Sequence, residues 1–432
     1  MKSVVIIGGG ASGMMAAISA ARAGAAVTLL EAGRRPGSKL LLTGNGRCNL
    51  TNLDPDLSGK YASQEGTDAG VFAASVLRQL SVTDTLRLFE ECGLLTMTEH
   101  GTYVYPVTGK SESVLNVLLR ELQRLKVKMK YNARVTGIDR ENGTWLVRTD
   151  GWSYPCDSVI LCCGSRAVPS TGSDGMGYEL CRGLGLEVTD ILPALTAVRC
   201  RLDEEDCRPF EMDQFRADAR RGNKKARQTA DSPKDPLQEA AGTRMRAEVS
   251  AYADGTLLCS EEGQIQFTQT DLSGIVVFNV SRFVTRALRA GKDVQIRLNL
   301  LPEKTTEELE QILRRLRTQR PEDPMSALLA GILPPGLIGL FSGESDPAAA
   351  ARRIRSLPLR ALRLRDFDNC QVCAGGVRLR QMDPDTLECA PAGRKGIFIA
   401  GELADIDGPC GGYNLQWAWS SGYTAGLHAA MD

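Results

Sequence analysis

The chain has 432 residues, of which 43% are hydrophobic, so it can bury a large core and is long enough for two or three domains. It carries 52 Lys and Arg and 52 Asp and Glu, so its net charge is zero. This overall charge does not indicate binding to nucleic acid or to an anionic membrane. The apolar start at residues 4–7 runs directly into glycines and is too short for a membrane span. Thirteen scattered cysteines fit reduced thiols better than a disulfide framework, so we expect a cytoplasmic protein.

Residues 1–31 have the pattern of a βαβ unit. Residues 3–7 are apolar and β-branched, which predicts a buried strand, and an alanine-rich helix follows to about Ala23. Residues 26–30 predict a second strand, which Glu31 closes. The order of these elements favours an α/β fold with a parallel sheet.

A glycine motif, Gly8-x-Gly10-x-x-Gly13, joins the first strand to the helix. Glycines at these positions permit a tight turn, close approach of the backbone to a pyrophosphate and close packing of helix on strand. The first helical turn then faces the phosphates with free N–H groups and the positive end of the helix dipole. Glu31 follows about 20 residues later, where a carboxylate accepts hydrogen bonds from a ribose. Together these features predict a dinucleotide site.

Segments further along the chain favour FAD over NAD. A glycine-rich turn at residues 37–52 contains Arg47 and Asn49, which can reach around a pyrophosphate toward a flavin. A buried strand at residues 159–162 also ends in glycine, at Gly164.

The carboxyl-terminal segment adds a second cradle for phosphate or flavin. A strand ends in Gly401-Glu402, and Gly411-Gly412 then begin a helix that runs to about Ala430. The amino end of such a helix stabilises negative charge on a reduced flavin ring. A nicotinamide enzyme has no need of this return of the chain, so we expect FAD.

The middle of the chain predicts an insertion. A helix is expected at residues 112–126, and turns divide an antiparallel meander into strands at 131–139, 144–149 and 152–155. Residues 196–300 alternate like β-structure, and amphipathic helices are expected at 303–320 and 347–356. We therefore predict an FAD-binding domain of residues 1–190 and 367–432, an inserted β-rich substrate domain of residues 191–302 and 357–366, and a helical subdomain of residues 303–356.

The stretch from Arg216 to Arg246 is polar and basic. We interpret it as a solvated insertion. A surface for a partner or for gating the substrate is the alternative. Nucleic acid is disfavoured because no aromatic residues are interleaved with the charges.

Longer stretches make the sequence similar to a known family. They are GGGASG at 8–13, KLLLTGNGRCNLTN at 39–52, GTYVYPVTGKSESVLNVLLREL at 101–122, AGGV at 374–377 and AGELADIDGPCGGYNLQWAWSSGYTAG at 400–426. On these stretches the chain resembles the HI0933-like flavoproteins, also called BaiN-like or aminoacetone-oxidase-like. The resemblance implies FAD and a Rossmann-type α/β fold of the two-dinucleotide-binding-domain flavoprotein type. It also implies an inserted β-rich domain with a small helical subdomain.

The resemblance further implies an activity and a set of binding residues. Family members oxidise or reduce small organic molecules, and one named activity is the reduction of conjugated double bonds in 3-oxo bile acids. Carried over by position, these residues would line FAD: Gly10, Ala11, Ser12, Gly13, Glu31, Lys39, Arg47, Asn49, Val135, Glu402 and Asn414. Neighbours in the same motifs complete the candidate set: Gly8, Ala32, Gly46, Cys48, Gly164, Gly401, Gly411, Gly412 and Leu415.

The sequence departs from the family pattern at three places. Cys163-Gly164 and Gly185-Leu186 stand where Gly-Gly and Gly-His are usual, and Ile275 replaces the proline of Leu-Ser-Gly-Pro. The basic stretch has no clear counterpart either. FAD binding survives these departures, whereas the identity of the substrate does not transfer.

The cysteines and histidines are interpreted as structural. Cys370 and Cys373 are expected to be packing residues on a strand; the alternatives are a redox dithiol or, with Cys389 and Cys410, an iron–sulfur cluster. Only two histidines are present, which excludes a histidine-rich metal site, and we expect no bound metal.

The leading hypothesis is an FAD-dependent oxidoreductase that reduces an activated C=C bond of a small organic molecule with electrons from NAD(P)H. Tyr413, Tyr105 and Arg47 are candidate proton donors or electrophiles because they lie in or near the flavin-facing motifs; for each, a role in positioning FAD is the alternative. Oxidation of a small amine and an RNA-associated flavoprotein remain as alternative functions. We expect a small-molecule substrate, no nucleic acid and no membrane partner, and the sequence leaves the oligomeric state open.

Overall fold

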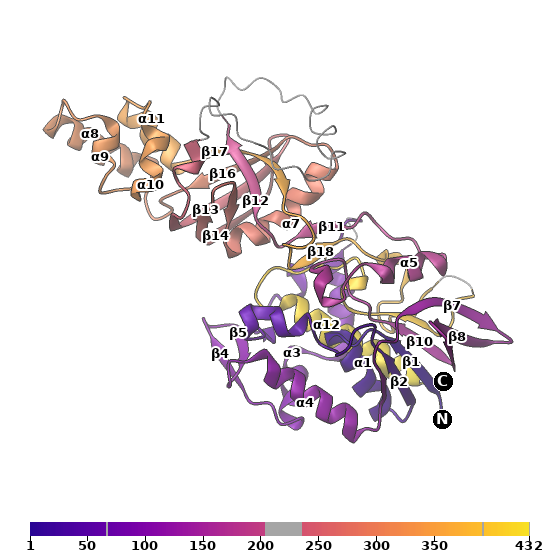
Figure 1. Cartoon of the computed structure of the whole chain (residues 1–432). Coiled ribbons are helices and arrows are strands. Elements are labelled where there is room, and N and C mark those ends of the chain that lie inside the picture. The colour runs from indigo at the N-terminus through magenta and orange to yellow at the C-terminus, as the bar shows by residue number, and fades with distance from the viewer. Residues whose placement is uncertain (66–67, 204–235, 391–392, 432) are drawn as a thin grey trace. The chain divides into compact units, whose positions relative to one another are not determined.

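The computed structural model describes residues 1–65, 68–203, 236–390 and 393–431. The chain divides into two compact units: Met1–Leu195 with Asp366–Asp432 form unit 1, and Thr196–Arg365 form unit 2. Unit 2 is therefore inserted in the sequence of unit 1, whose last part is the carboxyl-terminal segment of the chain (Figure 1).

Unit 1 mixes strands and helices. Its strands are β1 (Ser3–Ile7), β2 (Ala26–Leu30), β3 (Thr51–Asn52), β4 (Thr96–Glu99), β5 (Tyr103–Pro106), β6 (Lys128–Lys130), β7 (Val135–Glu141), β8 (Thr144–Thr149), β9 (Trp152–Cys156), β10 (Ser158–Leu161), β11 (Leu192–Ala194), β18 (Val372–Ala374) and β19 (Ile397–Ile399). Its helices are α1 (Ala11–Arg22), α2 (Ala69–Gln79), α3 (Val82–Glu91), α4 (Ser111–Arg124), α5 (Met176–Gly183) and α12 (Tyr413–Ala430).

The core of unit 1 is a five-stranded parallel sheet in the order β19-β10-β1-β2-β6. In this sheet Val5 of β1 lies opposite Thr28 of β2 and Val159 of β10. The central strands are continuous apolar runs because side chains on both faces of a parallel sheet are covered. The structure confirms the predicted Rossmann-type α/β fold, with the first and last parts of the chain in one sheet.

Helices α1 and α12 lie against each other with their backbones in close approach (Figure 1). A Cβ on Gly422 would lie 2.3 Å from the carbonyl oxygen of Ser12, and a Cβ on Gly426 would lie 2.3 Å from that of Ala16. Ser19 Oγ donates a hydrogen bond to the carbonyl oxygen of Tyr423 at 2.8 Å. Small residues on both helices therefore allow the carboxyl-terminal half of α12 to pack directly on α1.

The predicted meander is present, but its first strand starts later than expected. β7, β8 and β9 pair antiparallel, whereas residues 128–130 form the separate strand β6, which pairs in parallel with β2. The predicted strand at 131–139 is wrong over its first four residues. Asn132 adopts a φ of 52° there, and its N–H donates to the carbonyl oxygen of Gly33, so the chain turns between the two sheets.

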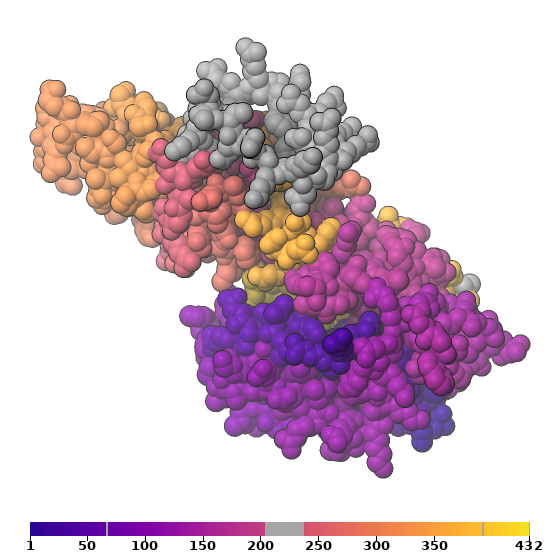
Figure 2. All heavy atoms as spheres, in the orientation of Figure 1, coloured from indigo at the N-terminus to yellow at the C-terminus, as the bar shows by residue number. Residues whose placement is uncertain are grey.

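Unit 2 is a β-barrel with helices. Its strands are β12 (Val198–Leu202), β13 (Arg244–Ala253), β14 (Thr256–Phe267), β15 (Asp271–Ser273), β16 (Val294–Asn299) and β17 (Leu357–Leu364). Its helices are α7 (Ile275–Arg289), α8 (Thr306–Gln319), α9 (Met325–Leu328), α10 (Pro335–Ile338) and α11 (Pro347–Arg355). The strands close in the order β12-β15-β14-β13-β16-β17. Helices α8 to α11 gather at one end of the barrel, drawn in orange in Figures 1 and 2.

Helix α7 corrects the prediction that residues 196–300, apart from the basic stretch, alternate like β-structure. Its buried residues Val276, Val280 and Val284 recur every four positions, which is the spacing of one helix face. Because these residues are β-branched, the segment resembles a strand in composition. The predicted helices at 303–320 and 347–356 are confirmed as α8 and α11, and the capping box of α8 forms between Thr305 and Glu308.

Two further expectations concern surfaces. Within the described ranges, none of the helices combines the length and the apolar character needed to cross a bilayer. Of the basic stretch, residues 216–235 lie outside the described part, and residues 244–246 begin strand β13.

Candidate functional site

The turn between β1 and α1 and the first turn of α1 contain glycines at which a side chain has no room. Gly8 has a φ of 105°, and a Cβ there would lie 2.4 Å from the carbonyl oxygen of Cys162. A Cβ on Gly13 would lie 1.9 Å from the carbonyl oxygen of Gly8. Gly10 differs, because a Cβ there would meet nothing within 4 Å. The fold itself requires Gly8 and Gly13, whereas the space beside Gly10 is room for a ligand.

The amino end of α1 offers backbone N–H groups to such a ligand. Met14 N–H donates to the carbonyl oxygen of Gly10 at 2.9 Å, so the three N–H groups before it, those of Ala11, Ser12 and Gly13, have no acceptor within the helix. Among the described residues, no side chain caps this end and no acidic residue lies in the first turn. Uncapped N–H groups at a helix amino end bind phosphate groups. These residues therefore fit the pyrophosphate of a dinucleotide.

The carboxylate of Glu31 is held beside this turn, at the carboxyl end of β2. Its Oε2 accepts a hydrogen bond from Gly9 N–H at 2.8 Å, and its Oε1 accepts one from Gly33 N–H at 2.6 Å. Each oxygen keeps a further lone pair for a hydroxyl group. The backbone carbonyl of Glu31 accepts from Ala133 N–H at 2.9 Å, which brings the start of β7 and Val135 to the same place. The carboxylate is thus held in place and keeps acceptor positions that fit a ribose.

The glycine-rich loop that follows is anchored to β4 and β5. Arg47 forms a bidentate ion pair with Glu99, at 3.0 Å and 2.5 Å, and its guanidinium lies 4.3 Å from the ring centroid of Tyr105. The hydrogen bond to Glu99 raises the pKa of Arg47, so the guanidinium stays charged. Two of the three candidate catalytic residues, Arg47 and Tyr105, are therefore in direct contact.

A second polar cluster joins segments far apart in the sequence. Glu402 follows β19, and its Oε2 accepts hydrogen bonds from Lys39 Nζ at 2.6 Å and from Ser165 Oγ at 3.1 Å. Ser165 is fully buried, and the Lys39 and Glu402 side chains are mostly buried. Lys39 and Glu402, which the sequence assigns to FAD from opposite ends of the chain, thus meet at one point.

The amino end of α12 repeats the features of α1. Gly411 and Gly412 have φ values of 112° and 97°, and a Cβ on Gly412 would lie 2.5 Å from the carbonyl group of Thr51. Within the described residues no side chain caps this helix and its first turn holds no acidic residue. The side chain of Asn414 is occupied by the preceding loop, since it donates to the carbonyl oxygen of Gly408 at 2.8 Å. Its backbone N–H belongs to the uncapped first turn and fits a group with negative charge.

Tyr413, the first residue of α12, points its hydroxyl group at a carboxylate. The phenol donates to Asp54 Oδ2 at 2.7 Å. Burial opposes ionisation of Asp54, but the hydrogen bonds from Tyr413 and from Asp56 N–H outweigh it and lower the pKa of this carboxyl group. The Tyr413 proton is therefore engaged by an ionised partner.

All residues of the candidate FAD set lie in unit 1. The members not yet placed are Ala32 (exposed, after Glu31), Gly46 and Cys48 (positive φ, in the loop of Arg47), Asn49 (buried, after that loop), Gly164 (positive φ, after β10), Gly401 (after β19) and Leu415 (first turn of α12). Sequence reasoning missed the partners Asp54, Glu99 and Ser165. They lie outside any motif, and Glu99 is 52 positions from Arg47, so no local signal marks it.

The cysteines fall into different environments. Cys162 packs in the core, as expected for the end of a buried strand. Cys370 and Cys373 lie together, but among the described residues no three Cys, His, Asp or Glu side chains gather into a group that could hold a metal. This overturns the iron–sulfur alternative that joined them with Cys389 and Cys410.

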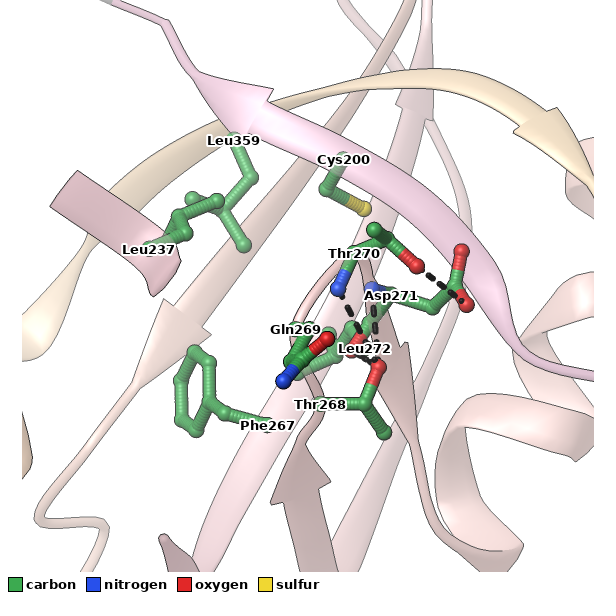
Figure 3. Close-up of a pocket in the computed structure, with 9 residues that line it drawn as sticks. All are labelled: Cys200, Leu237, Phe267, Thr268, Gln269, Thr270, Asp271, Leu272 and Leu359. Carbon is green, nitrogen blue, oxygen red and sulfur yellow. Dashed lines mark hydrogen bonds between the residues drawn. The ribbon is translucent and has the colours of Figure 1, made fainter. Parts of the chain in front are cut away.

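A small pocket lies in unit 2, at the end of the barrel where β14 turns into β15. Figure 3 shows the side chains of Phe267, Leu272 and Leu359 around it, with the turn of Thr268 and Asp271 at one side. Thr268 Oγ1 accepts from Asp271 N–H at 2.9 Å and so closes this turn. Thr270 Oγ1 also donates to Asp271 Oδ2 at 3.0 Å, and none of the residues assigned to FAD contributes to the pocket.

Comparison with known proteins supports the assignment of unit 1. The sequence matches the family described as HI0933-like protein Rossmann domain over residues 2–428. It is 37% identical to the 3-dehydro-bile acid delta(4,6)-reductase of Clostridium scindens, over 100% of this chain and 99% of that protein. It is 25% identical to the ribosomal RNA dihydrouridine synthase of Escherichia coli, over 97% of this chain and 96% of that protein.

Solved structures with a similar trace are more distant. A 3-ketosteroid-delta4-(5alpha)-dehydrogenase from Rhodococcus jostii is 16% identical with a TM-score of 0.44, over 100% of this chain and 97% of the other. A flavocytochrome c3 fumarate reductase is 14% identical with a TM-score of 0.45, over 100% and 79%. The family match over nearly the whole chain confirms the resemblance found in the sequence. The chain belongs to the HI0933-like family of FAD-binding flavoproteins, and it is an FAD-dependent oxidoreductase.

Proposed function

We propose that this flavoprotein reduces a C=C bond conjugated to a carbonyl group in a small, steroid-like molecule, with electrons from NADH or NADPH. The observation that carries the proposal is the 37% identity, over both full lengths, to a protein named as a bile-acid delta(4,6)-reductase. The basic stretch at 216–246 and Ile275 distinguish this chain from the family pattern, so the substrate class is proposed rather than a single bile acid.

The residues of unit 1 would hold the cofactor in two halves. The N–H groups at the amino end of α1 would bind the pyrophosphate, and Glu31 would bind the adenosine ribose. Lys39 and Glu402 would contact the flavin half, and the amino end of α12 would offset negative charge there. Bound FAD supplies the hydride, while the protein orients the substrate and provides a proton.

Among the candidate catalytic residues, we assign the proton donor to Tyr105. In the part of the chain that the structure describes, its hydroxyl group has no hydrogen-bond partner, whereas Tyr413 donates to Asp54. Burial raises the pKa of Tyr105, and the nearby Arg47 offsets this only partly, so the phenol keeps its proton at neutral pH. Arg47 would polarise the substrate carbonyl, and Tyr413 would hold the amino end of α12 in place.

The domain assignment is part of this proposal. Residues 1–190 and 367–432 would bind FAD, and residues 191–302 with 357–366 would select the substrate. The helical segment 303–356 would brace the β-rich part. Substitutions in the barrel should therefore change turnover of different substrates while FAD content stays the same.

The test is anaerobic flavin reduction followed by substrate addition. The purified flavoprotein is reduced with NADH or NADPH, and 3-oxo-4-ene steroids and 3-oxo-4,6-diene bile acids are then added in turn. Reoxidation of the flavin together with a product heavier by two hydrogen atoms supports the proposal. Oxygen consumption with small amines, and no reoxidation by any enone, would favour the amine oxidase alternative instead.

Reduction of uracil in ribosomal RNA is the second candidate function. The relatives from Escherichia coli and Haemophilus influenzae are 25% and 24% identical over nearly the whole chain, and both are named ribosomal RNA dihydrouridine synthases. Uracil also contains a C=C bond conjugated to a carbonyl, so the chemistry is of the same kind. The higher identity to the bile-acid reductase and the zero net charge favour the small molecule. Incubation of the reduced protein with unmodified ribosomal RNA, followed by nucleoside analysis, separates the two.

A further inference from the structure

Glu99 ends strand β4 and lies on the same face of its sheet as Tyr105. The strand pairs antiparallel with β5, so that Glu99 is opposite Tyr103 and Met97 is opposite Tyr105. Directly opposite residues share a face of a sheet, and so do residues two positions apart on one strand. Glu99 is therefore the diagonal neighbour of Tyr105, and a long side chain between them can contact both.

The side chain that contacts both is that of Arg47, from the loop before β3. Its backbone is held by the loop, since Arg47 N–H donates to the carbonyl oxygen of Gly44 at 3.1 Å. Its side chain is long, and 39% of its surface is exposed. Among the described residues the guanidinium donates hydrogen bonds to Glu99 alone, from Nη1 to Oε2 at 3.0 Å and from Nη2 to Oε1 at 2.5 Å.

The bidentate ion pair is the stronger of the two contacts that Arg47 makes. Two parallel hydrogen bonds to a carboxylate fix the plane of a guanidinium as well as its position. The other contact is with the Tyr105 ring, whose centroid lies 4.3 Å from the guanidinium. A cation beside an aromatic ring at a partly exposed site is attracted only weakly. Without Glu99, therefore, little would hold the long Arg47 side chain in a single rotamer.

We infer that Glu99 is a positioning residue for the reduction: it holds the Arg47 guanidinium over Tyr105, so that the cation and the proton donor face the same substrate carbonyl system. The inference rests on the function proposed above, in which Tyr105 gives the proton and Arg47 polarises the carbonyl. Glu99 acts through Arg47 rather than on the substrate.

The charges around the Tyr105 phenol make the position of Arg47 measurable. Burial raises the pKa of Tyr105 most; Arg47 then lowers it, and Glu99 and the thiol of Cys48 raise it by less. His100 acts on the Glu99 carboxyl group. If only the Glu99 charge is lost, the pKa of Tyr105 should fall. If Arg47 also leaves the ring, the pKa should rise, because the larger and opposite effect is lost as well.

The first measurement is the ionisation of Tyr105 in the intact flavoprotein, which needs no substrate. Tyrosine is labelled with ¹³C at the ζ carbon, and the resonance that is missing from Tyr105→Phe identifies the residue. In Glu99→Gln an amide group replaces one acceptor oxygen, so the bidentate pair with Arg47 cannot form. We expect less ionised Tyr105 in Glu99→Gln than in the wild type at the same alkaline pH. More ionised Tyr105, or an unchanged fraction, would show that Arg47 keeps its place without Glu99 and would overturn the inference.

The second measurement is a double-mutant cycle in enone reduction, with rates expressed per bound flavin. Glu99→Gln should lower kcat by about 10²-fold with KM and flavin content little changed, which is the loss that a misplaced active-site group causes. In a protein that already carries Arg47→Ala, the same change should have no further effect, because nothing remains to be positioned. Equal losses in both backgrounds would mean that Glu99 acts independently of Arg47.

Glu141→Gln is the matched control. Glu141 also pairs with an arginine of unit 1, Arg148, at 2.6 Å, and both side chains are exposed. This variant should match the wild type in Tyr105 ionisation and in kcat, and a change as large as that of Glu99→Gln would show a general effect of lost surface charge.

The two measurements separate this inference from the proposed function. If no enone is reduced, or if Tyr105→Phe turns over like the wild type, the proposed function or its proton donor fails, and the ionisation of Tyr105 still decides whether Glu99 holds Arg47. If the enone is reduced but the cycle is additive, the positioning role of Glu99 alone is refuted.

Discussion

Alanine at Gly10 should separate the binding of the cofactor from the folding of the turn. Gly10 is the N-cap residue of α1 with φ −79° and ψ −169°, a conformation that alanine adopts without strain. A Cβ there meets no atom within 4 Å. Replacing glycine by alanine reduces the entropy of the unfolded chain by about 0.4–1 kcal/mol, and the loss of a favoured N-cap residue costs a similar ~0.5–1 kcal/mol. The stability of the apoprotein should therefore change by less than about 0.5 kcal/mol.

The effect on FAD should be much larger. The added methyl group occupies the space through which the backbone would approach the pyrophosphate, and extra volume in a well-packed contact costs roughly 1–3 kcal/mol. The dissociation constant of FAD should then rise about 5- to 150-fold. Gly13→Ala is the matched comparison, because its Cβ would lie 1.9 Å from the carbonyl oxygen of Gly8. That contact should cost more than about 3 kcal/mol and lower the Tm of the apoprotein by about 3 °C or more.

The assay measures both quantities on the same preparations. FAD is removed with acid, the Tm of each apoprotein is taken by circular dichroism, and FAD is titrated back by calorimetry. The expected pattern is a normal Tm with weak FAD binding for Gly10→Ala, and a low Tm for Gly13→Ala. Wild-type FAD affinity in Gly10→Ala would refute the placement of the pyrophosphate at the amino end of α1.

Three other outcomes are expected. Glu31→Ala should weaken FAD binding by about 1.5–3 kcal/mol because hydrogen bonds to a charged group are lost. Calorimetric titration should then show a dissociation constant roughly 10- to 150-fold higher, and an unchanged affinity would place the ribose elsewhere. Tyr105→Phe should lower turnover of an enone by about 10²–10⁴-fold with FAD content unchanged, whereas Tyr413→Phe should not; equal losses in both would contradict Tyr105 as the proton donor. Hydrogen bonds from Arg124 and from Arg22 outweigh burial and lower the pKa of Glu121 from its ordinary 4.5 to about 2. The ionised Glu121 carboxylate therefore stabilises the fold fully above pH 4.5, and this stabilisation is lost as the pH falls toward 2. Urea unfolding of Glu121→Gln should therefore depend less on pH in that window, and an identical pH profile would show that this carboxylate is not responsible.

The parts of the fold that the sequence predicted are those set by short-range patterns. Strand β1, the turn at Gly8 and helix α1 are contiguous in the sequence. Gly8 and Gly13 are required by close contacts with the residue after the adjacent strand and within the motif itself. Helix α7 was not predicted because β-branched residues such as Val276, Val280 and Val284 are common in strands. In the structure these residues are buried along one face of a helix. Tertiary packing overrides local preference at such positions.

In the candidate site, too, the residues within motifs could be predicted and their partners could not. The motifs located the residues expected to face FAD, and the structure brings Lys39 and Glu402 together from positions 363 apart. The partners Asp54, Glu99 and Ser165 could not be predicted, because a single carboxylate or hydroxyl in a loop has no distinguishing pattern. They become visible only when the fold places them within 3.1 Å of a motif residue.

The close contact of α1 with α12 has a consequence for how the protein is made. Ser19 and Tyr423 are 404 positions apart, so the ribosome synthesises α1 long before the helix that covers it. Until then the face of α1 that α12 covers has no native partner, although amino-terminal segments generally begin to fold first during translation. The nascent chain should therefore depend on chaperones until its final segment emerges, and premature termination anywhere before residue 413 should yield aggregation rather than a partly active protein.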